Sequence, residues 1–75
     1  MTTADVVKER ALWLARSEPD GDAALRDLES CAGGRRVAAV RARQQVEAEL
    51  DDGPDRDSSL RAIQLLDELV VRLPA

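Results

Sequence analysis

The apolar positions near the end of the chain recur at helical spacing and predict a helix over 58–73. At about 100° per residue, most of its apolar side chains fall within one arc of roughly 160°. They are Ala62, Ile63, Leu65, Leu66, Leu69, Val70 and Leu73. Leu60 and Val71 extend the apolar surface beyond that arc. A stripe this wide predicts a helix that contacts more than one neighbour.

Three shorter stripes precede this helix and predict helices at 3–16, 21–32 and 35–51. The breaks between them have recognisable turn chemistry. A Pro-Asp-Gly segment ends the first helix, and a Gly-Gly pair ends the second. An acidic stretch with Gly53 and Pro54 ends the third, and Asp57 or Ser58 is expected to cap the last. No segment has the alternating pattern of a strand.

These elements predict an all-α fold, a compact four-helix bundle built from two helical hairpins, with 1–75 as a single domain. Residues 19–28 and 54–63 share a Pro-Asp turn that leads into a capped helix, at an offset of 35 residues. The similarity fits a duplicated hairpin. Two helix starts that use the same capping chemistry are the favoured interpretation.

The third predicted helix has apolar residues on two sides. Small side chains dominate the stronger stripe, which favours close approach of a neighbouring helix. That stripe consists of Ala38, Ala39, Ala42, Val46 and Leu50. Val37 and Val40 begin a weaker stripe on the opposite side. The pattern predicts a helix that is central in the bundle or shared with another chain.

The composition leaves little material for catalysis. The chain has no His and one Cys, so Ser/His and Cys/His pairs and Cys/His metal sites are excluded. The acidic turn at 51–57 is interpreted as a solvated, helix-capping segment, because Pro54 interrupts any calcium-loop pattern. We therefore expect no enzyme activity, no cofactor and no metal. Without a visible secretory or membrane-spanning segment, a cytoplasmic location and no membrane partner are expected.

The segment Asp57-Ser58-Ser59-Leu60, followed by an apolar helix, resembles the region around the modified serine of acyl and peptidyl carrier proteins. In that family an Asp-Ser-Leu start precedes an apolar helix, so the resemblance implies a modified serine at Ser58 or Ser59. This sequence departs from the pattern, because a second serine separates Asp-Ser from Leu60. A serine helix cap accounts for the same residues.

Charge is distributed unevenly along the chain, whose net charge is −4. The segments 1–32 and 51–75 are acidic, whereas 33–50 carries Arg35, Arg36, Arg41 and Arg43 against two Glu. The simplest interpretation is that the segments neutralise one another, and Arg43 can pair with Glu47 one turn away. Two further interpretations are an acidic protein partner and a helix-turn-helix that reads DNA through 35–48.

The function predicted from these patterns is a non-enzymatic small helical protein–protein interaction module: an adaptor, regulator or docking domain. Its partner would be a second copy or an acidic-surfaced protein, because small cores are often completed by a partner. Trp13 fits either the core or the centre of such an interface. The predicted contact residues are Trp13, Arg35, Arg36, Val37, Val40, Arg41, Arg43, Leu60 and Val71. A DNA-binding regulator is the alternative, and the acidity of the chain makes nucleic acid the less favoured partner.

Overall fold

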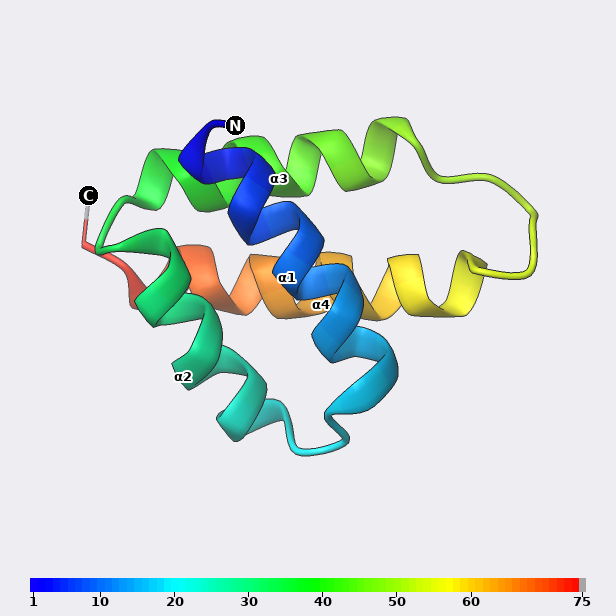
Figure 1. Cartoon of the computed structure of the whole chain (residues 1–75), viewed down its shortest axis with the longest axis horizontal. Coiled ribbons are helices and arrows are strands. Elements are labelled where there is room, and N and C mark those ends of the chain that lie inside the picture. Colours follow the sequence, from blue (N-terminus) through cyan, green and yellow to red (C-terminus); the bar gives the residue numbers. More distant parts are fainter. Residues whose placement is uncertain (75) are drawn as a thin grey trace.

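A computed structural model describes residues 1–74 and confirms an all-α four-helix bundle. The helices are α1 (Thr3–Ser17), α2 (Gly21–Ala32), α3 (Arg36–Ala48) and α4 (Arg56–Arg72). In Figure 1, α3 and α4 run antiparallel, and α1 crosses in front of them before α2 returns alongside it. The radius of gyration is 11.0 Å, which is close to the ~11 Å expected of a compact chain of this length.

Local side-chain chemistry determines where the first hairpin begins and turns. The Thr2 hydroxyl accepts from the amide of Asp5, and the Asp5 carboxylate accepts from the amide of Thr2, each at 3.2 Å. This reciprocal capping box starts α1. The carboxylate of Asp20 accepts from the amide of Asp22 at 3.0 Å and starts α2. Gly33 ends α2 at a φ of 59°, a left-handed conformation that glycine adopts without strain.

The second hairpin starts and stops differently from the predicted bounds. α3 ends at Ala48 instead of 51, because Glu49 leaves the helical conformation and the amide of Leu50 bonds the Glu47 carbonyl at 3.2 Å. The Asp51 carboxylate then accepts from the amide of Gly53 at 2.9 Å, which turns the chain away. α4 begins at Arg56, two residues before the predicted 58, and its cap position is Asp55.

The core is aliphatic and rich in alanine. Ala39 and Ala42 on α3 are fully buried, so the α3 backbone packs closely against α1 and α4. Leu66 and Leu69 of α4 are equally buried. The weaker stripe of α3 faces outward, with Val37 exposed and Val40 half-buried. α3 is therefore central on one side only, and its second apolar stripe lies at the surface.

Charged side chains connect the ends of the helices. Arg61 of α4 donates from Nη1 to the carbonyl oxygens of Leu14 and Ala15, at 3.1 and 2.9 Å, in the last turn of α1. A cation is favourable there because helix C-terminal carbonyls carry partial negative charge. Lys8 of α1 pairs with Glu49 after α3 at 2.5 Å. These contacts hold α1 against the second hairpin.

Candidate interaction surfaces

An exposed apolar strip runs along the outer side of α1. Val6 and Trp13 are 42% and 51% exposed, at positions seven residues apart on the same helix face. Together with Met1, Glu9 and Arg10 they line a shallow hollow of about 360 Å³. We call these residues the Trp13 surface. The capping box holds the first turn of α1, so this surface stands on an ordered helix.

Arg10 contacts the Trp13 ring and links it to α2. Its guanidinium carbon lies 4.5 Å from the centre of the Trp13 ring, within the range of cation–π attraction. The same guanidinium donates two hydrogen bonds to the Asp27 carboxylate on α2, from Nε at 2.9 Å and from Nη2 at 2.7 Å. This bidentate pair raises the pKa of Arg10 and lowers the pKa of Asp27, mainly through the hydrogen bonds.

Cys31 lies beside this ion pair. The side chain is half-buried, and its Sγ donates to Asp27 Oδ1 at 3.6 Å. Burial, followed by the Asp27 charge, raises the pKa of the Cys31 thiol. The thiol therefore stays protonated at neutral pH and is a weak nucleophile. Cys31 packs against the hydrophobic core as a small, partly buried side chain.

The four arginines of the α3 region separate into two kinds. Arg43 pairs with Glu47 one turn along α3 and with Asp67 on α4, which confirms the expected pairing with Glu47. Hydrogen bonds to these two carboxylates, that of Asp67 first, raise the pKa of Arg43. Arg43 thus joins α3 to α4, and the two carboxylates neutralise the charge that it would offer to a partner.

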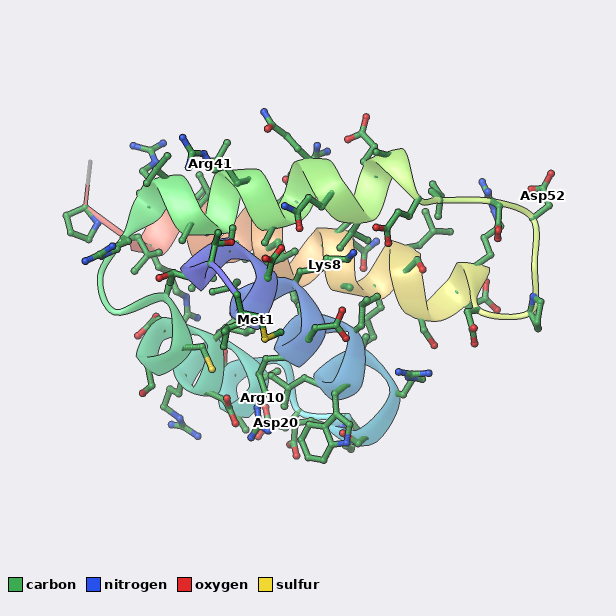
Figure 2. The ribbon with its side chains drawn as sticks, turned by 45° about the horizontal axis from the view of Figure 1, so that its top comes forward. Met1, Lys8, Arg10, Asp20, Arg41 and Asp52 are labelled. Carbon is green, nitrogen blue, oxygen red and sulfur yellow. The ribbon has the colours of Figure 1, made fainter. Side chains whose placement is uncertain are left out.

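Arg35, Arg36 and Arg41 are exposed, and no carboxylate within residues 1–74 forms an ion pair with them. Val37 lies among them and is 56% exposed. Arg35, Val37 and Arg41 line a hollow of about 150 Å³ with Thr2 and Thr3 from the start of α1. We call Arg35, Arg36, Val37 and Arg41 the cationic surface. Figure 2 shows Arg41 at the upper edge of the molecule on α3, whereas Arg10 lies on the lower side of α1.

The remaining predicted contact residues lie on the outer faces of α3 and α4. Val71 is 82% exposed and Leu60 is 38% exposed, near opposite ends of α4. Val40 is half-buried on α3, one turn before Arg43. None of these three residues lines the hollow beside Trp13.

The contact residues predicted from the sequence did not include Met1, Val6 and Arg10, which belong to the Trp13 surface. Val6, Arg10 and Trp13 are spaced four and three residues apart, which is a same-face pattern in a helix. That spacing was a readable signal. The spacing did not reveal that this face of α1 is exposed. That depends on the position of α2, which contacts α1 through the Arg10–Asp27 pair.

The end of the bundle near the α3–α4 turn holds the serine pair. Ser58 and Ser59 are half-buried in the first turn of α4 and line a hollow of about 220 Å³ with Arg16, Glu49 and acidic turn residues. Neither serine is the helix cap, since that position belongs to Asp55. In the described part of the chain, no group of three or more His, Cys, Asp or Glu side chains is placed to hold a metal ion.

Comparisons of the chain with protein-family models, with curated proteins and with solved structures found no match. Within residues 1–74, no helix is both long enough and apolar enough to cross a membrane.

Proposed function

We propose that this chain is a non-enzymatic protein–protein interaction module that binds its partner through the Trp13 surface. The observation that carries the proposal is the exposure of Trp13, the one aromatic residue of the chain, at 51% on an ordered helix. Tryptophan is enriched among the residues that dominate binding energy at interfaces. Burying the exposed half of this side chain would contribute about 2–3 kcal/mol.

The neighbours of Trp13 support an interface rather than an isolated exposed side chain. Val6 and Met1 add apolar area on the same side of α1. Arg10 contacts the indole and is itself held by Asp27 of α2. The Trp13 side chain therefore loses little conformational freedom when a partner binds. Preorganisation of this kind strengthens binding because the entropic cost of ordering is already met in the free protein.

A different protein fits this surface better than a second copy. A twofold axis that places Val6 of one copy against Trp13 of the other must pass close to Glu9 and align the two α1 helices antiparallel. Equivalent flanks of the helices then meet, so Glu9 of each copy would face its own counterpart. Like charges at that position oppose self-association.

To test the proposal, the purified chain is used as bait to capture a binding protein. That protein is then purified, and the complex is reconstituted from the two pure components. Trp13→Ala should weaken the reconstituted complex at least tenfold, and Val6→Ser should weaken it less. Arg26→Ala is the matched control, because Arg26 is exposed on α2 and does not line the hollow beside Trp13. If Trp13→Ala and Arg26→Ala bind the purified partner equally well, the Trp13 surface is not the interface. Light scattering of the chain alone identifies self-association.

The alternative is a DNA-binding regulator that reads through α3, supported by three exposed arginines near the start of that helix. In a helix-turn-helix the preceding helix packs on the reading helix, whereas α2 makes only slight contact with α3 in this bundle. A titration with labelled duplex at low and moderate salt separates the two functions, because phosphate contacts give a steep salt dependence. Absence of binding at low salt eliminates the DNA function.

A further inference from the structure

We propose that the cationic surface docks an acidic segment of a partner protein that carries an apolar residue between its acidic ones. The proposal deepens the interaction function and rests on it. It concerns a second surface, on α3 instead of α1. Arg35, Arg36 and Arg41 supply positive charge, and Val37 supplies an exposed apolar contact between them.

The fold has already used most other cations of the chain. Lys8, Arg10, Arg43, Arg56 and Arg72 form ion pairs, and Arg61 bonds the carbonyls at the end of α1. The three arginines of the cationic surface have no such role in the described residues, although the net charge of −4 offers many carboxylates. Three uncompensated guanidinium groups within seven residues thus mark the one strongly basic region of an acidic chain.

The start of α3 adds to the positive potential of this surface. No side chain caps this helix, in contrast to α1 and α2, and its first turn contains no acidic residue, in contrast to α1, α2 and α4. The partial positive charge of the helix start is therefore not offset by a carboxylate of the helix itself. The positive potential at the start of α3 would therefore attract the carboxylates of a partner.

Two features favour a peptide over a nucleic acid as the occupant. Val37 lies in the middle of the arginines and lines a hollow with Thr2 and Thr3, which suits an aliphatic side chain. Phosphate backbones offer no such group. In addition, Glu47 follows Arg36 by eleven residues and so lies on the same face of α3. The cluster that Glu47 forms with Arg43 and Asp67 has one more carboxylate than cations, and it would repel the extended phosphate track of a duplex.

The test uses a short fluorescein-labelled glutamate-rich peptide with one central leucine and measures its binding by fluorescence anisotropy at low salt. The double variant Arg36→Gln/Arg41→Gln should bind about tenfold more weakly than the wild type. Arg16→Gln/Arg26→Gln is the matched control, because these exposed arginines form no ion pair in the region 1–74, and it should bind like the wild type. Replacing the leucine of the peptide by serine should also weaken binding.

Three outcomes would overturn the proposal: no peptide binding at low salt, equal loss in both double variants, or a labelled duplex that outcompetes the peptide. The midpoint temperature of thermal unfolding should be the same for both variants, since the substituted side chains make no ion pair within residues 1–74. Trp13→Ala should leave peptide binding unchanged. The two surfaces are therefore tested independently. A failed peptide experiment would not contradict the proposed role of the Trp13 surface, and a failed Trp13 experiment would not contradict peptide binding by the cationic surface.

Discussion

At the scale of single residues, the arginines of this chain perform distinct tasks that composition alone does not separate. Arg61 bonds the end of α1, Arg43 joins α3 to α4, and Arg10 supports the Trp13 ring. Their hydrogen-bond partners lie 17 or more residues away in sequence, apart from Glu47, whereas the Trp13 ring lies three residues from Arg10. Helical spacing could predict only these two local contacts, because the others depend on how the helices cross.

Arg61→Met should lower the free energy of unfolding by about 1–2 kcal/mol. Methionine keeps the apolar stem but leaves the carbonyl oxygens of Leu14 and Ala15 without their cationic donor, which is half-buried between α1 and α4. Urea denaturation measures the change, with Arg26→Met as the control for loss of an exposed charge. Equal stability of the two variants would show that Arg61 does not hold α1 in place.

At the scale of elements, the sequence predicted the helices well and their ends less well. The core faces of α1 and α4 follow from helical spacing, which is a local property. The early end of α3 depends on the Asp51–Gly53 turn, which competes with helix continuation and leaves no periodic signal. The exposure of Trp13 could not be predicted for a related reason: it lies at the margin of the α1 stripe, and the position of α2 decides what covers that margin.

The turn between α2 and α3 provides a test at this scale. Gly33→Ala should destabilise the fold by about 1 kcal/mol, because its φ of 59° is unfavourable for a residue with a Cβ atom, although no atom lies within 4 Å of the added group. Gly21→Ala is the control. It begins α2 without a left-handed φ and has equal space, so it should be neutral or stabilising. Similar losses in both variants would contradict this account.

At the scale of the whole molecule, the two candidate surfaces occupy different sides of the bundle. The Trp13 surface lies on the outer side of α1, and the cationic surface lies where α3 begins beside Thr2 and Thr3 (Figure 2). One offers apolar area and the other offers charge. A chain with two such surfaces suits the role of an adaptor that contacts one partner at two places or two partners at once.

The proposed interface requires that the Trp13 side chain be available to a partner in the free protein. Because Trp13 is the one tryptophan, acrylamide quenching of its fluorescence in dilute protein reports on this side chain alone. We predict a red-shifted emission maximum with strong quenching, as expected for an indole that is half exposed. A blue-shifted emission that resists quenching in the dilute monomer would place Trp13 in the core and contradict the proposed interface.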